Sequence, residues 1–293
     1  MVRRLAAASG GSSLVLLVAA CGLDDLTGGA VDAGAADASS TPGADAARDG
    51  ASATPEAGAD GGSAGCAGFP PTVKFCDDFD TGDSTLEKWP LATVDPGSVV
   101  EKSAAQSKSA PRAARFRAGA PASVKPSDGI GASLRKTFPD SPPKIRWSFS
   151  MIVPEAPKTT GSFVAFAPIA FNVPTGYLDV RLESERNAAG ALTTRIQQTI
   201  EVAQPYDYIE ATLSDPLPVG RWFRVEVNID VQSHTVSVSF DGKVEATMTL
   251  DAKYKPSPFI ARAGIHYVSA KNDAPSPVDG WEMFFDDVVV DYD

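Results

Sequence analysis

Residues 222–250 read WFRVEVNIDVQSHTVSVSFDGKVEATMTL, and apolar and polar side chains alternate through most of this stretch. Val225, Val227 and Ile229 lie on one side of the first segment, and the polar residues between them face the other way. Such alternation is typical of a half-buried β-strand. The Asp-Gly dipeptide at 241–242 is typical of a tight hairpin turn. The stretch therefore predicts antiparallel strands with one face in a core.

The same pattern recurs elsewhere in the chain. RWSFSMIV (146–153) alternates in this way, and strand signals run through 73–293 without a convincing amphipathic helix. Short turns between alternating strands favour antiparallel sheets packed on one another. We therefore predict that residues 66–293 form one all-β domain, an antiparallel two-sheet β-sandwich (jelly roll), preceded by a disordered linker.

Three segments resemble a known fold family. They are FCDDFDTGDSTLEKWP (75–90), PVGRWFRVEVNID with HTVSVSFDGKVEATM (218–248), and WEMFFDDVVVDYD (281–293). They resemble the concanavalin A-like lectin/glucanase (LamG-like) jelly rolls, in which the last strand lies beside the first. The resemblance covers roughly 70–293 and implies the fold. It does not assign an activity, because the fold hosts lectins, glycosidases, lyases and inert spacers.

The N-terminus has the layout of a secretory signal peptide at residues 1–20. Two arginines precede the apolar run LVLLV at 14–18, and small residues lead to Cys21. This arrangement resembles the lipobox of bacterial lipoproteins, in which the cysteine thiol carries a diacylglyceryl group. We expect an exported protein anchored in a membrane through lipids on Cys21, at the outer membrane or cell surface. An ordinary signal peptide with a chance cysteine is the alternative.

Residues 21–65 predict a disordered linker. Positions 22–65 hold eight acidic residues, a single base at Arg48, and few large apolar side chains. Such a segment buries too little apolar surface to offset the entropy of ordering it. The whole chain has a net charge of −11 and no cluster of lysine and arginine, which argues against nucleic acid as a partner.

The three cysteines fit an exported protein. With Cys21 lipidated, Cys66 and Cys76 remain, and an oxidising compartment favours a disulfide between them. Two free thiols are the alternative.

Catalytic patterns are sparse. The glucanases of this fold share an E-x-D-x-x-E strand, which this chain lacks. The lyases of this fold share an Arg-rich strand, a Q-x-H strand and a K-A-G-x-Y strand. FIARAGIHYVS (259–269) resembles the last of these, with Arg262, His266 and Tyr267 as candidate catalytic residues. A Tyr/His pair can do acid and base work at the α-carbon of a uronate. The alternative is that His266 is a strand residue hydrogen-bonded within the sheet.

A ligand-binding face is predicted from three consecutive strands with polar side chains at every second position. These residues are Tyr177, Asp179, Arg181, Glu183, Arg195, Gln197, Tyr208 and Glu210. If the strands are neighbours, planar polar groups and aromatic rings share one sheet face, as sugar recognition requires. A solvated outer face with cross-strand charge pairs is the alternative.

Carboxylates at both ends of the domain suggest a structural Ca²⁺. Asp77, Asp78 and Asp287 come together if the first and last strands pair, and hard cations bind such oxygen clusters. We expect no other cofactor.

Together these observations predict a cell-surface lipoprotein whose β-sandwich binds a polysaccharide or another polymer without catalysis. A polysaccharide lyase or glycoside hydrolase of the same fold is one alternative. A structural or adhesive envelope module without a small ligand is another.

Overall fold

A computed structural model describes residues 65–120, 129–173, 176–201, 207–270 and 278–293, which all belong to one compact unit. Within these ranges no helix is long and apolar enough to cross a membrane. A short 3-10 helix, η2 (Gly65–Gly68), precedes the first strand.

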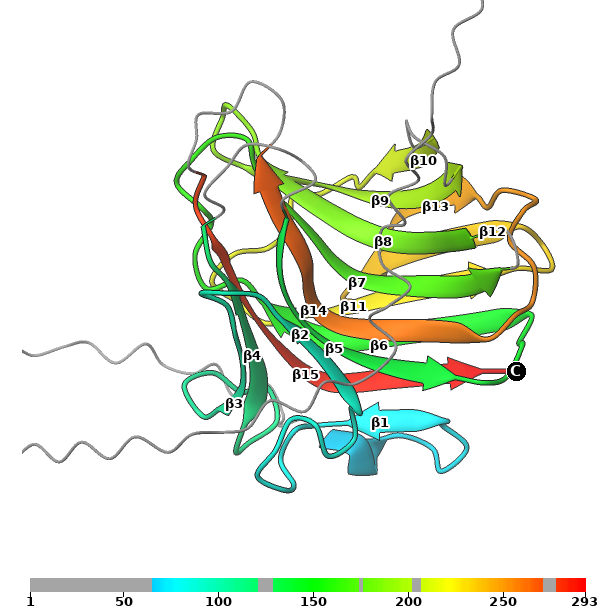
Figure 1. Ribbon diagram of the computed structural model, residues 1–293, viewed down its shortest axis with the longest axis horizontal. Coiled ribbons are helices and arrows are strands. Elements are labelled where there is room, and N and C mark those ends of the chain that lie inside the picture. Colours follow the sequence, from blue (N-terminus) through cyan, green and yellow to red (C-terminus); the bar gives the residue numbers. More distant parts are fainter. Residues whose placement is uncertain (1–64, 121–128, 174–175, 202–206, 271–277) are drawn as a thin grey trace, which may run out of the picture. The chain divides into compact units, whose positions relative to one another are not determined.

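Two antiparallel sheets make up this unit (Figure 1). The eight-stranded sheet has the order β13-β12-β11-β6-β15-β4-β3, with β1 paired to β15, and consists of β13 (Lys243–Thr249), β12 (Thr235–Phe240), β11 (Phe223–Asp230), β6 (Lys144–Ile152), β15 (Trp281–Tyr292), β4 (Ala113–Ala118), β3 (Val99–Ser103) and β1 (Phe75–Asp77). The seven-stranded sheet has the order β10-β9-β8-β7-β14-β5-β2 and consists of β10 (Asp207–Thr212), β9 (Leu192–Glu201), β8 (Gly176–Arg186), β7 (Ser162–Val173), β14 (Phe259–Ala270), β5 (Ile130–Phe138) and β2 (Leu91–Val94). The predicted all-β sandwich is confirmed.

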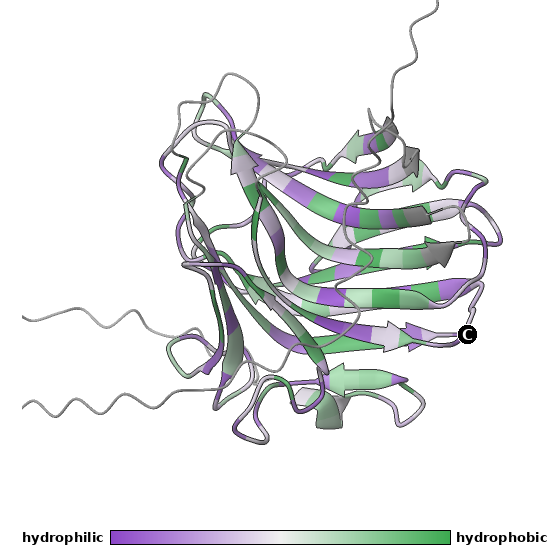
Figure 2. Ribbon diagram, viewed as in Figure 1, coloured by the Kyte–Doolittle hydropathy of each residue, from purple (hydrophilic) through white to green (hydrophobic). Residues whose placement is uncertain are grey.

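The alternating stretch behaves as its sequence predicts. Along β11, buried and half-buried residues alternate without a break, and β11 pairs with β12 and β6. Asp241 and Gly242 both have positive φ angles, 48° and 82°, which a primed hairpin turn requires at its two central positions. Figure 2 shows the same alternation of hydropathy along other strands.

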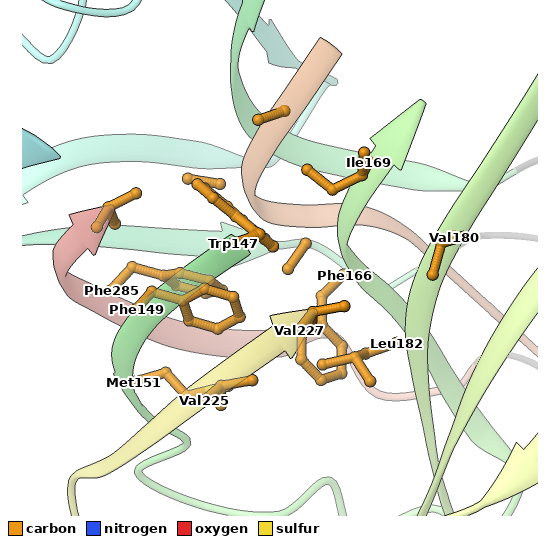
Figure 3. Packing of buried hydrophobic residues seen from close by; sticks show 14 of the residues in the cluster. Trp147, Phe149, Met151, Phe166, Ile169, Val180, Leu182, Val225, Val227 and Phe285 are labelled. Atoms are coloured by element: carbon orange, nitrogen blue, oxygen red, sulfur yellow. The ribbon is translucent and has the colours of Figure 1, made fainter. Parts of the chain in front are cut away.

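The core lies between the two sheets and is rich in aromatic rings (Figure 3). Trp147 and Phe149 of β6 and Phe285 of β15 contribute from the eight-stranded sheet, and the rings of Phe149 and Phe285 stack with centroids 4.8 Å apart. Phe166 of β7 and Leu182 of β8 face them from the seven-stranded sheet. The side chains that alternate with these apolar residues on β7 and β8 point away from the core.

The start of the domain is fixed to its end. β1 pairs with β15, as the resemblance implies, and a disulfide joins Cys66 to Cys76 with their Cα atoms 5.7 Å apart. The predicted disulfide is therefore confirmed. Asp77 of β1 accepts a hydrogen bond of 2.8 Å from the buried indole of Trp89. These contacts hold the entry of the chain against the last strand.

We predict that replacing both cysteines by serine lowers the free energy of unfolding by about 2–3 kcal/mol, because a disulfide that closes a loop of this size limits the unfolded chain. Urea denaturation of the oxidised protein and of the Cys66→Ser/Cys76→Ser variant measures the difference. A reductant should lower the stability of the parent to that of the variant and leave the variant unchanged. Equal stability of the two oxidised proteins contradicts the prediction.

Candidate functional site

The side of the seven-stranded sheet that faces away from the core, here called the outer face, gathers most of the polar candidates. Its strands β10, β9, β8, β7, β14 and β5 are consecutive neighbours, so residues from distant parts of the chain share this face. The polar side chains of these strands include Asp179, Arg181, Glu183, Arg195, Gln197, Thr199, Tyr208, Glu210, Arg262, His266, Tyr267 and Arg135.

Arg181 is the centre of a buried ion network. Its guanidinium donates to Glu183 Oε1 at 2.9 Å, to Asp179 at 3.0 Å, and to Gln197 Oε1, so each of its three nitrogens is hydrogen-bonded. Asp179 is fully buried, and Arg181 and Glu183 are nearly so. The alternative drawn from the sequence is a solvated face with cross-strand charge pairs. The centre of the face is buried, and cross-strand charge pairs are present next to it.

A second arginine extends this network to the edge of the sheet. Arg195 Nε lies 2.9 Å from Glu183 and 3.2 Å from Glu210, and Gln197 donates to both carboxylates. Together with Asp179 and Arg181, the network contains three carboxylates and two guanidinium groups. This half of the outer face is consequently acidic on balance.

The buried carboxylate of Asp179 is unsuited to act as the acid of a glycosidase. Asp179 and Glu183 are four residues apart on β8, with Arg181 between them. Burial by itself raises the pKa of Asp179, but the charge of Arg181 and the hydrogen bond from Thr199 outweigh it, and the pKa lies below its usual value. A glycosidase needs one carboxyl group that stays protonated. Asp179, held as an anion by Arg181, does not supply one.

Irregular pairing at the middle of β14 presents two consecutive residues to the outer face. Ile265 pairs with Phe166 of β7, but Tyr267, not His266, takes the next partner. Gly264 has a φ of +96°, and a Cβ there would come 2.3 Å from the ring of Phe116. A β-bulge of this kind turns side chains that alternation would separate toward the same side.

His266 and Tyr267 consequently lie together on the outer face. Their ring centroids are 5.2 Å apart, and the guanidinium carbon of Arg181 lies 5.8 Å from the centre of the Tyr267 ring. In the described part of the chain, no side chain hydrogen-bonds the imidazole of His266. This differs from the alternative in which His266 is held by a hydrogen bond in the sheet.

The surroundings set the protonation of both groups. Burial and the positive charge of Arg262 lower the pKa of His266 to about 3, although Asp179 acts in the opposite direction. Burial raises the pKa of Tyr267 above its usual value. At neutral pH the imidazole of His266 is therefore uncharged, with one nitrogen that can accept a proton. The phenol of Tyr267 is protonated and can donate one.

Arg262 stands directly opposite Arg135 of β5 in the strand register. The Nε atom of Arg262 is buried without a hydrogen-bond partner, and no described residue forms an ion pair with its guanidinium. A buried donor without a partner costs free energy. An anion bound at Arg262 would relieve this cost.

Small side chains on β7 separate the two halves of this face. Ala165 is paired with Tyr267 on one side and with Glu183 on the other, and Ala170 is paired with Asp179. Phe163, also on β7, is larger, and its ring lies 5.7 Å from the ring of Tyr267, centroid to centroid. The arginine pair on β14 and β5 thus faces the acidic network on β8 to β10 across a strand that carries these alanines and this ring.

The structure brings two predicted sites together. The sequence predicts His266, Tyr267 and Arg262 as candidate catalytic residues and predicts a separate ligand-binding face of eight polar residues. Both groups lie on the outer face. The side chain of Tyr177 is outside the described residues. Arg135 is not among the residues predicted from the sequence. The alternation in ASLRKTF (132–138) does indicate its position, because it follows the core residue Leu134 and so lies on the other face of the sheet.

The three aspartates predicted to bind calcium interact with other groups of the protein. Asp77 binds Trp89 and lies 3.2 Å from Lys88 Nζ, Asp78 accepts from the backbone of Cys66, and Asp287 accepts from a serine hydroxyl. No group of three or more His, Cys, Asp or Glu side chains in the described ranges could hold a metal ion. The calcium site stays a prediction, and no chemistry below depends on it.

Comparison with known proteins identifies the fold. No protein-family model and no curated protein matches the sequence. An endo-β-1,4-glucuronan lyase from the fungus Trichoderma reesei is similar in structure, with 15% identity, a TM-score of 0.57, and coverage of 76% of this chain and 96% of its own.

Two other solved structures are similar over comparable lengths. Alginate lyase Aly36B, in complex with alginate trisaccharide, has 12% identity and a TM-score of 0.51, covering 74% of this chain and 95% of its own. A Bacteroides ovatus mixed linkage glucan GH16 protein in complex with a product has 14% identity and a TM-score of 0.50, covering 74% and 99%. The chain shares a concanavalin A-like jelly roll with these proteins, and such identities show the fold alone.

We predict that His266 stays neutral when the pH is lowered from 7 to 5. A folded-state pKa of about 3 lies below the 6.5 of an ordinary histidine, so the unfolded chain binds more protons between these values and stability falls as the pH falls through this window. The sequence holds two histidines, so NMR of the imidazole groups can follow both, with His266→Gln as the assignment control. A His266 signal that titrates near pH 6.5 would contradict the account.

Proposed function

We propose that the outer face binds a uronate-containing polysaccharide and cleaves it by β-elimination. Arg262 and Arg135 hold the uronate carboxylate, His266 is the base and Tyr267 is the acid. The observation that carries this proposal is the guanidinium of Arg262, which has no described partner and lies on the same strand face as a neutral imidazole.

A carboxylate is the anion that best fits this position. Guanidinium groups bind planar carboxylates through paired, charge-assisted hydrogen bonds. Neutralising the carboxylate also makes the hydrogen on the adjacent C5 atom of the sugar more acidic. The bound anion cancels part of the charge of Arg262 that lowers the pKa of His266, so substrate binding strengthens the base.

The reaction balances with the groups present. The unprotonated nitrogen of His266 takes the proton from C5, and the electron pair of that bond forms a double bond between C4 and C5. The bond between C4 and the glycosidic oxygen breaks, its electrons move to that oxygen, and the hydroxyl of Tyr267 donates the proton the oxygen needs. Water then returns the proton from the imidazolium of His266 to the phenolate of Tyr267.

The comparisons support this choice of reaction class. Of the three similar structures described above, two are lyases, one named for glucuronan and one for alginate, and both names denote polymers of uronic acids. The buried carboxylate of Asp179, by contrast, is unsuited to act as the acid of a glucanase.

Binding without cleavage is the second candidate, and a separate observation favours it. All three nitrogens of Arg181 are engaged by protein groups, and Thr199 stands where the Q-x-H pattern of the lyases has histidine. A face of this kind can hold a glycan as a lectin does. The double bond of the product separates the two candidates.

We further propose that Cys21 carries the lipid that attaches the chain to the cell envelope. The signal-like residues 1–20 and the small residues before Cys21 support this localisation, and all of them lie outside the described residues.

For the elimination reaction, we predict that the full-length chain generates ultraviolet absorbance from the new double bond when it is mixed with a uronate polysaccharide. His266→Gln and Tyr267→Phe should each lower kcat by about 10²–10⁴-fold, the usual contribution of a general acid or base. Arg262→Gln should lower kcat/KM by about 10–100-fold through loss of a charge-assisted hydrogen bond.

The charge-matched control is Arg117→Gln on β4 of the other sheet, whose side chain is exposed. Binding of the polymer without a double bond would support the second candidate in place of the first. Activity that survives all three outer-face substitutions would place the chemistry elsewhere.

For the anchor, we predict that cells expressing the chain incorporate labelled palmitate into it and that Cys21→Ser abolishes the label. Cys66→Ser/Cys76→Ser is the control, because those sulfurs form a disulfide and should not affect labelling. An unlabelled parent protein in a bacterial host would argue for an ordinary signal peptide.

A further inference from the structure

We infer that the substrate alternates uronic acid with neutral sugar and is not a polymer of uronic acids alone. This inference rests on the proposed function and adds the substrate class. It follows from the opposite character of the two halves of the outer face on either side of His266 and Tyr267.

One half is cationic. Arg262 on β14 and Arg135 on β5 stand opposite each other, and no described acid forms an ion pair with Arg262. This half offers one place for a carboxylate, on the strand that also carries the proposed base.

The other half is acidic and already paired. Asp179, Glu183 and Glu210 form ion pairs with Arg181 and Arg195, and each nitrogen of Arg181 already donates to a protein group. The side chain of Glu210 is 48% exposed, so a sugar passing over β9 and β10 would meet its carboxylate. A second uronate carboxylate here would face like charge.

An exposed aromatic ring in this half can contact the apolar face of a neutral sugar. Tyr208 on β10 is 42% exposed, and the guanidinium carbon of Arg181 lies 5.4 Å from the centre of its ring. Aromatic rings bind the apolar faces of sugars, while amide groups such as that of Gln197 bind hydroxyls. This half therefore suits an uncharged ring with hydroxyl groups.

The two halves are close enough to contact one saccharide chain. β14 and β8 are separated only by β7, so their backbones are about 10 Å apart, two strand spacings. Between them β7 presents Ala165 and Ala170, and the ring of Phe163 on the same strand packs against Tyr267. A chain that places a uronate on Arg262 thus places a neighbouring sugar over the acidic half, where a carboxylate is rejected by repulsion.

The test compares cleavage of two kinds of polymer by the full-length chain. Hyaluronan and unsulfated chondroitin alternate glucuronate with a neutral amino sugar, and alginate and glucuronan carry a carboxylate on every ring. We expect kcat/KM, followed by the ultraviolet absorbance of the product, to be about tenfold or more higher on at least one alternating polymer than on either homopolymer.

Two variants test the cause of this preference. Glu210→Gln removes the exposed carboxylate and should raise kcat/KM on the homopolymers by about threefold or more, a typical effect of one exposed charge, with little change on the alternating polymers. Glu226→Gln makes the same change of charge on β11 of the other sheet and should change nothing.

The outcomes separate this inference from the proposed function. Cleavage of the homopolymers at equal or higher kcat/KM overturns the inference and leaves the elimination reaction standing. A preference for alternating polymers that Glu210→Gln does not narrow overturns the electrostatic cause. Absence of the double bond with all four polymers overturns the proposed function, and this inference with it.

Discussion

The guanidinium of Arg181 donates to Asp179, Glu183 and Gln197, and the rest of the outer face depends on these bonds. Buried carboxylates are costly unless they are paired, so without Arg181 this half of the sheet would carry uncompensated charge. The pairing has a chemical consequence. It holds Asp179 as an anion, so this carboxyl group cannot serve as the protonated acid of a glycosidase. Arg262, on the same strand as His266, forms no ion pair with a described residue.

The second constraint is the irregular pairing of β14 with β7. A regular strand would place His266 and Tyr267 on opposite faces, whereas here Ile265 and Val268 enter the core and both polar rings remain outside. Gly264 permits this arrangement, since the ring of Phe116 leaves no room for a Cβ. The core therefore helps to position the proposed acid and base, which links packing on one side of the sheet to chemistry on the other.

The sequence predicts the fold well because the signals for it lie within single strands and turns. Alternation identifies inward and outward positions, Asp241-Gly242 marks a hairpin, and two cysteines ten residues apart form the disulfide. The site is only partly predictable. β14 follows β8 by more than seventy residues, so nothing local indicates that the two share one face beside β7. The partner Arg135 and the bulge at Gly264 depend on this long-range pairing, and the lipid on Cys21 and the calcium site remain predictions.

The proposed reaction depends on binding of a substrate carboxylate by Arg262. A crystal structure of the full-length His266→Gln variant with a glucuronate-containing oligosaccharide tests it most directly, because the variant should bind without turnover. The account predicts a uronate carboxylate within hydrogen-bond distance of the Arg262 guanidinium, with C5 of that sugar facing position 266. A carboxylate bound at Arg195, or a saccharide bound away from the outer face, would contradict it.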